Sequence, residues 1–116
     1  NTACLLAQAL QLQPEQCTVT FQSRFGPARW LQPYTEPTLR ALAEAGTRSV
    51  DVMCPGFVSD CLETLEEINM EARHTFLQAG GQAFDYIPCL NDSSEWIVAL
   101  KRITEQHLAG WVAVPA

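Results

Sequence analysis

An unusual concentration of carboxylates marks the middle of the chain. Five of the thirteen acidic residues fall within twelve positions: Asp60, Glu63, Glu66, Glu67 and Glu71. If this stretch is an α-helix, all of them except Glu66 lie within an arc of about 80° and form a file about 16 Å long. Such a file could guide a hard or borderline divalent cation while leaving it exchangeable, and a carboxylate near a strand end could accept a proton. An ordinary solvated helix face explains the same spacing, so both interpretations stay open.

A second group with chemical potential lies on a loop rich in glycine and proline, residues 23–34. The loop carries Arg24, Arg29, Trp30 and Tyr34 directly after a predicted strand. A flat aromatic ring beside two cations at the mouth of a crevice suits a planar, anionic and largely apolar ligand. Trp30 could also do no more than fill a gap between elements.

The hydrophobic pattern predicts the elements that would position these groups. β-Branched and aromatic runs predict strands over residues 17–22, 49–53 and 83–87. Helical spacing and capping signals predict four helices: over residues 3–12, from Thr35 as N-cap to Gly46, from Ser59 or Asp60 to the Gly80-Gly81 pair, and from Ser93 or Ser94 to about His107. This alternation is typical of an α/β fold with a parallel sheet and helices on both faces, in which the loops after the strands line the ligand crevice.

The same helical wheel predicts which side of the long helix is buried. Its apolar residues gather on one face: Leu62, Leu65, Ile68, Ala72 and Phe76. Cys61 falls on the same side, so we expect it to be a structural residue.

Length and composition limit the class of protein. The 116 residues carry a net charge of −6 and are 47% hydrophobic, which indicates one globular domain and disfavours a nucleic-acid partner. No apolar run approaches the roughly 20 residues that span a bilayer. We assign residues 1–110 to the domain and residues 111–116 to a tail. Because the first residue is Asn1, we expect the chain to be a piece of a longer protein.

The five cysteines are scattered and odd in number, which favours free thiols in a reducing compartment over a disulfide framework. Cys54 and Cys61 are the closest pair in sequence, and the chain has no C-x-x-C motif. We therefore do not expect this segment to hold an iron–sulfur cluster.

Two stretches resemble a known family: residues 21–35, FQSRFGPARWLQPYT, and residues 54–68, CPGFVSDCLETLEEI. They are similar to the second domain of ferrochelatases, the enzymes that insert Fe²⁺ into protoporphyrin IX, and resemble the Gram-negative bacterial branch. The likeness continues at lower density through residues 87–91, IPCLN, to the last predicted helix. It implies two similar α/β domains around a cleft. Each would be a three-layer sandwich with a four-stranded parallel sheet, of which at least three strands would lie in this chain.

The resemblance also implies roles for individual residues. Glu63 would be the active-site glutamate, taking porphyrin protons or handling the metal, and a raised pKa would suit it to this task. Asp60, Glu67 and Glu71 would join it in an acidic metal path. The porphyrin would be bound by three residues of the loop: Trp30 as an aromatic wall, Arg24 near the propionates, and Tyr34.

The implied partners are protoporphyrin IX, ferrous iron as a substrate, and the N-terminal domain of the same chain. No resident cofactor is required. The implied location is the cytoplasm, with or without peripheral contact with the inner face of the cytoplasmic membrane.

Two departures from the family pattern affect these expectations. Cys61 stands where some members carry a histidine. The catalytic histidine of the family belongs to an upstream motif, and this chain has only His74 and His107, both expected at the surface. We therefore expect a C-terminal fragment with about half of an active site, inactive by itself.

Other interpretations are weaker. A small cobalt-type chelatase would suit the length but uses histidine ligands. A flavodoxin-like, non-catalytic binding module could hold Mg²⁺ or a basic partner on its acidic helix, although its acids should lie at strand ends. A degenerate half-domain would also lack the histidine. The sequence does not decide between protoporphyrin and coproporphyrin, nor the oligomeric state.

Overall fold

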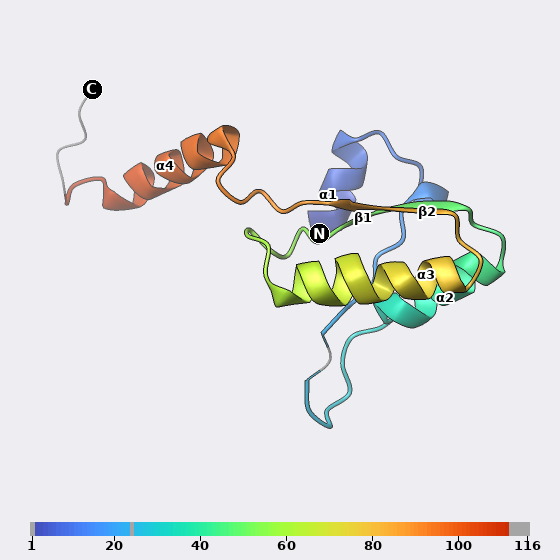
Figure 1. Cartoon of the computed structure of the whole chain (residues 1–116). Coiled ribbons are helices and arrows are strands. Elements are labelled where there is room, and N and C mark those ends of the chain that lie inside the picture. Colours follow the sequence, from blue (N-terminus) through green and yellow to red (C-terminus); the bar gives the residue numbers. More distant parts are fainter. Residues whose placement is uncertain (1, 24, 112–116) are drawn as a thin grey trace.

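Two parallel strands form the centre of the structure, a computed structural model that describes residues 2–23 and 25–111 (Figure 1). Strand β1, Ser49–Met53, pairs with β2, Ala83–Ile87, in parallel register from Ser49 opposite Ala83 to Met53 opposite Ile87. Both strands have the predicted bounds. The parallel pairing and the helical connection between the strands confirm the α/β class.

One long helix connects the strands, and its hydrogen-bonding pattern changes along its length. It consists of η2, Glu63–Ala72, a π-helix, and α3, Arg73–Gln78, an α-helix. The backbone N–H of Arg73 reaches back five residues to the oxygen of Ile68, which is the π-helical bond. We predicted an α-helix with Ser59 or Asp60 as its N-cap; the N-cap is instead Leu62, and the helix is π-helical over Glu63–Ala72.

The long helix buries only part of the apolar face predicted for it. Thr64, Ile68 and Ala72, spaced four apart, are the buried residues of η2. Leu62 is 70% exposed and Leu65 is 46% exposed, so their predicted place in the core is wrong. The other three predicted core residues, Ile68, Ala72 and Phe76, are buried, which confirms that part of the predicted face.

The core lies between this long helix, the strands and α2, Thr35–Glu44. Figure 1 shows α2 and α3 together on one side of the strands. The fully buried Phe76 ring of α3 lies 6.2 Å from the ring of Phe84 on β2, and the guanidinium carbon of Arg73 lies 5.2 Å from the centre of the Phe84 ring. The rest of the buried apolar cluster consists of Leu39, Ala43, Cys54, Ile68 and Ala72.

The predicted strand over residues 17–22 does not form. Its last part makes a single parallel bridge, Phe21 with Tyr34, through bonds from Phe21 N to Pro33 O (2.9 Å) and from Thr35 N to Phe21 O (3.1 Å). The ladder cannot grow, because Pro33 has no N–H to donate and Thr35 already begins α2. The described residues thus contain a two-stranded sheet, and three strands in this chain are not observed.

The remaining helices agree with the prediction in type and approximate position. The first, α1, spans Thr2–Ala9, ending earlier than predicted, and a short 3₁₀ helix, η1, follows at Pro14–Gln16. Tyr34 rather than Thr35 is the N-cap of α2. The last helix, α4, spans Ser94–Leu108 with Ser93 as its N-cap, as predicted. It buries none of its residues and extends away from the other elements (Figure 1).

None of the helices in the described part of the chain is long and apolar enough to cross a membrane. The predicted tail falls almost entirely outside the described residues, and the division at residue 110 stays a prediction.

Candidate functional site

Four glutamates line a shallow pocket of about 280 Å³ on η2, together with Leu62: Glu63, Glu66, Glu67 and Glu71. Glu66, Glu67 and Glu71 lie four, five and nine residues after Leu62. This spacing places them on one face of a helix with i to i+5 bonds. The π-helix therefore adds Glu66 to the carboxylate face, which the α-helical wheel had excluded. It brings together three of the four predicted metal residues.

Asp60, the fourth predicted metal residue, does not line this pocket. It precedes the helix, and its carboxylate accepts hydrogen bonds from Tyr86 Oη at 2.6 Å, Asn91 Nδ2 at 2.8 Å and Thr64 Oγ1 at 2.9 Å. The bond from Tyr86, followed by that from Asn91, holds the pKa of Asp60 far below its ordinary value. Asp60 is thus an ionised acceptor tied to the loop after β2.

Glu63 is exposed at the start of the pocket. A hydrogen bond with the Cys61 side chain, and a further one with its own backbone, hold the pKa of Glu63 below its ordinary value. We expected a raised pKa, but an exposed carboxylate that accepts hydrogen bonds is stabilised in its charged form. Cys61, which we expected to be a structural residue, is a half-buried free thiol that contacts Glu63.

Residues at the start of the loop attach it to η2. Gln22 Nε2 donates to the backbone oxygen of Glu63 at 2.7 Å, and the Cys54 thiol donates to Gln22 Oε1 at 3.3 Å. Burial raises the pKa of Cys54 to about 11, so this thiol stays protonated and able to donate. Ser23 binds both oxygens of Glu67, through its N–H at 2.7 Å and its hydroxyl at 2.5 Å. Glu67 therefore anchors the loop as well as lining the pocket.

The loop itself forms an open hollow of about 480 Å³, lined by Phe25, Ala28, Arg29, Trp30 and Leu31. Trp30 is 41% exposed, and its indole N–H donates to the backbone oxygen of Phe25 at 2.8 Å. This bond holds the ring at the hollow and leaves part of its surface open to a ligand.

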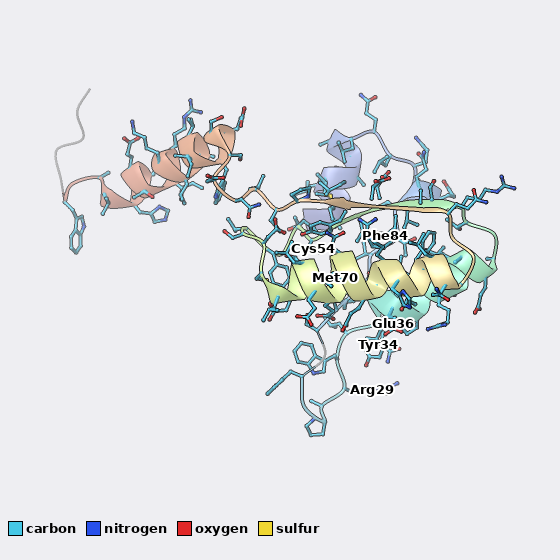
Figure 2. The ribbon with its side chains drawn as sticks, in the orientation of Figure 1. Arg29, Tyr34, Glu36, Cys54, Met70 and Phe84 are labelled. Carbon is cyan, nitrogen blue, oxygen red and sulfur yellow. The ribbon has the colours of Figure 1, made fainter. Side chains whose placement is uncertain are left out.

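The other two predicted porphyrin residues are not part of this hollow. Tyr34 is half-buried at the base of the loop, nearer to α2 than Arg29, which lies on the part of the loop that projects from the body (Figure 2). Arg24 lies outside the described residues.

The other candidate ligands are distributed rather than clustered. Within residues 2–23 and 25–111, no three histidine, cysteine or acidic side chains lie close enough to hold a metal ion. His74 and His107 are exposed, as predicted. The five cysteines are free thiols, as predicted.

Comparison with known proteins gives these features a context. A family model described as ferrochelatase matches residues 1–108. The chain belongs to the ferrochelatase family. Among related ferrochelatases, that of Methylibium petroleiphilum is 66% identical over 111 residues, 96% of this chain. Those of Janthinobacterium sp. and Herminiimonas arsenicoxydans are 64% and 62% identical over 114 residues, 98% of this chain.

The chain spans about 31% of the length of these ferrochelatases. All three come from Gram-negative bacteria, which agrees with the branch indicated by the sequence. The comparisons give no support to the alternative of a flavodoxin-like binding module.

Sequence reasoning missed several residues that build the site in this member of the ferrochelatase family. Gln22, Ser23 and Asn91 stand inside the stretches that carry the resemblance, but their side-chain roles depend on contacts with residues 31 to 44 positions away. Glu66 was missed because the wheel assumed an α-helix. In the sequence, only the negative charge of Glu66 indicated that it could belong to the carboxylate face.

Proposed function

We propose that the complete protein inserts Fe²⁺ into protoporphyrin IX, forming protohaem and releasing two protons, and that this chain supplies the carboxylate half of the site. The observation that carries the proposal is the pocket lined by four glutamates at the root of an aromatic loop, in a chain of the ferrochelatase family. Taken alone, the chain is expected to be inactive, because the histidine implied by the resemblance is not part of it.

The reaction requires a group that removes two protons from pyrrole nitrogens while the metal enters. Glu63 is exposed and ionised at neutral pH, so it can attract the cation and accept a proton. Enclosure beside a bound porphyrin would remove water from Glu63 and raise its pKa toward that of a useful base. Glu66, Glu67 and Glu71 extend the negative surface along which hydrated Fe²⁺ reaches the ring and protons leave.

The loop supplies the binding surface for the porphyrin in this proposal. The exposed face of Trp30 stacks against the ring, and Arg24 and Arg29 attract the propionates. Tyr34 supports the loop from its base. Because Ser23 binds Glu67, the aromatic surface and the carboxylate pocket keep a fixed separation at the point where they meet.

The rest of the complete polypeptide supplies what this chain does not show. We propose that β1 and β2 belong to a four-stranded parallel sheet in a three-layer sandwich, and that a second, similar domain closes the cleft and provides the histidine. The apolar side of α4 packs on that remaining polypeptide. Fe²⁺ is a substrate, and proton removal with metal entry needs no resident cofactor and no iron–sulfur cluster in this segment. We place the protein in the cytoplasm, with the membrane surface as the source of its porphyrin.

The test follows the fluorescence of metal-free protoporphyrin IX in the presence of Fe²⁺ or Zn²⁺. The complete protein should quench this fluorescence catalytically, and the 116-residue chain alone should not. Failure of the complete protein to insert either metal into the porphyrin would overturn the proposed function.

A further inference from the structure

Asp60 and Asn91, which are 31 residues apart in the sequence, are joined by two hydrogen bonds just before the N-terminus of η2. The backbone N–H of Asp60 donates to Asn91 Oδ1 at 2.8 Å, and Asn91 Nδ2 donates back to Asp60 Oδ2 at 2.8 Å. The amide of Asn91 has only one workable orientation here. Turned over, it would set its NH₂ group against a backbone N–H and its oxygen against a carboxylate.

The backbone of Asn91 is suited to this pairing. Its φ of +49° lies in the left-handed region, which asparagine and aspartate enter more readily than other residues with side chains. Its N–H donates to the oxygen of Val58 at 3.0 Å. The loop after β2 is thus held at two points to the turn that precedes η2.

The second carboxylate oxygen of Asp60 is also occupied. Oδ1 accepts from Tyr86 at the end of β2 and from Thr64, which is fully buried in the first turn of η2. Thr64 in turn accepts from the backbone N–H of Cys61 at 3.0 Å. With three of its roughly four acceptor positions filled, Asp60 has little capacity left for a metal ion. Its bonds connect β2 to the turn of helix that contains Glu63.

On this basis, and given the proposed function, we propose that Asn91 is a positioning residue for metal insertion. Its reciprocal pair with Asp60, here called the clasp, fixes the first turn of η2 and so the place of Glu63 in the pocket. In the clasp Asp60 serves as a hydrogen-bond acceptor rather than as a metal ligand or proton carrier.

The clasp can be tested by exchanging its two side chains in the complete protein. Asp60→Asn alone leaves one acceptor oxygen for two sets of donors, so its NH₂ group faces either the NH₂ of Asn91 or the hydroxyls of Tyr86 and Thr64. Asn91→Asp alone sets two carboxylates against each other. In the double variant every bond has a donor and an acceptor again, with the carboxylate moved from position 60 to position 91. Aspartate tolerates the backbone conformation at position 91, so Asn91→Asp tests the pairing rather than the turn.

We expect each single variant to lower kcat for metal insertion by about 10–100-fold, with little change in the KM for porphyrin, and the double variant to recover most of the loss. All four proteins should have unfolding midpoints well above the assay temperature, so that a loss of kcat reports local misplacement rather than loss of the fold. A double variant as slow as Asp60→Asn would mean that the carboxylate is needed at position 60 itself and would overturn the proposal. Full activity of Asn91→Asp would overturn it as well. An inactive wild-type protein would instead refute the proposed function, and with it any positioning role.

Discussion

The carboxylates at the start of the long helix differ in the neighbours that hold them. Asp60 accepts three side-chain hydrogen bonds, Glu67 accepts two from Ser23, and Glu63 is in contact with Cys61. For Asp60 and Glu63, hydrogen bonds hold the pKa below its ordinary value, so both are ionised at neutral pH. At the residue scale Asp60 is therefore a fixed hydrogen-bond acceptor, and Glu63 is the ionised group that can attract a cation and accept a proton after the porphyrin displaces water.

The contact between Cys61 and Glu63 predicts the behaviour of one variant. In Cys61→Ala the hydrogen bond to the charged form is lost, so the pKa of Glu63 should rise toward its ordinary value of 4.5. The ¹³C shift of the Glu63 carboxyl, followed through a pH titration of the complete protein, measures this change. Cys4→Ala, at an exposed position on α1, is the control and should leave the titration unchanged. A Glu63 titration that is the same in both variants would contradict the contact.

The bond between Tyr86 and Asp60 predicts a dependence of stability on pH. The folded-state pKa of Asp60 lies below its ordinary value of 3.8, so its ionisation stabilises the fold above that value, and this stabilisation is lost as the pH falls. In Tyr86→Phe the pKa is less depressed, so the free energy of unfolding should fall less steeply as the pH drops below 3.8 toward the folded-state pKa. Urea unfolding at a series of pH values measures both slopes. Parallel curves for the two proteins would exclude a role of Tyr86 in lowering this pKa.

At the element scale, the two strands could be predicted to the residue because their β-branched and aromatic runs are short and end at turn signals. The π-helix could not be predicted, since the assignment of faces assumed 3.6 residues per turn. The α-helical wheel placed Ile68, Ala72 and Phe76 in the core correctly. It also placed Leu62 and Leu65 there and left Glu66 off the carboxylate face. The segment over residues 17–22 has the composition of a strand, but strand formation also needs a partner with free N–H groups, which Pro33 does not offer.

The end of the long helix offers a test of the core. Gly81 follows α3, and a Cβ at this position would clash with the fully buried ring of Phe76. Gly81→Ala should therefore lower the free energy of unfolding by about 1–3 kcal/mol. At Gly56 an added Cβ would meet no atom within 4 Å, and its φ is unstrained, so Gly56→Ala is the matched control and should be near neutral. Equal stability of the two variants in chemical denaturation would argue against this packing of Phe76.

At the scale of the whole molecule, the chain spans about 31% of the length of its relatives. It also exposes apolar side chains on its last helix. The last helix, α4, buries nothing, although Ile97, Leu100 and Ile103 follow one another at helical spacing and are 42–50% exposed. An amphipathic helix of this kind gains most of its stability by burying its apolar side. In the proposed complete protein, that side is covered by the remaining polypeptide.

Substitution on α4 tests this coverage. In the complete protein, Leu100→Gln should lower the free energy of unfolding by about 2–4 kcal/mol, because it removes buried apolar surface and buries an amide. Arg102→Gln, an exposed position on the same helix, should change it by less than about 0.5 kcal/mol. If denaturant unfolding gave the same small effect for both, α4 would be exposed in the complete protein too.

The central claim, that Glu63 accepts porphyrin protons during metal insertion, is tested most directly by the turnover of Glu63→Gln. The amide keeps the size of the side chain but cannot accept a proton at neutral pH, so kcat for Zn²⁺ or Fe²⁺ insertion by the complete protein should fall by roughly 10²–10⁴-fold. Its unfolding midpoint should stay close to that of wild type, since Glu63 is exposed. Glu44→Gln, at the exposed end of α2, should retain wild-type turnover. Wild-type turnover in Glu63→Gln would contradict the claim.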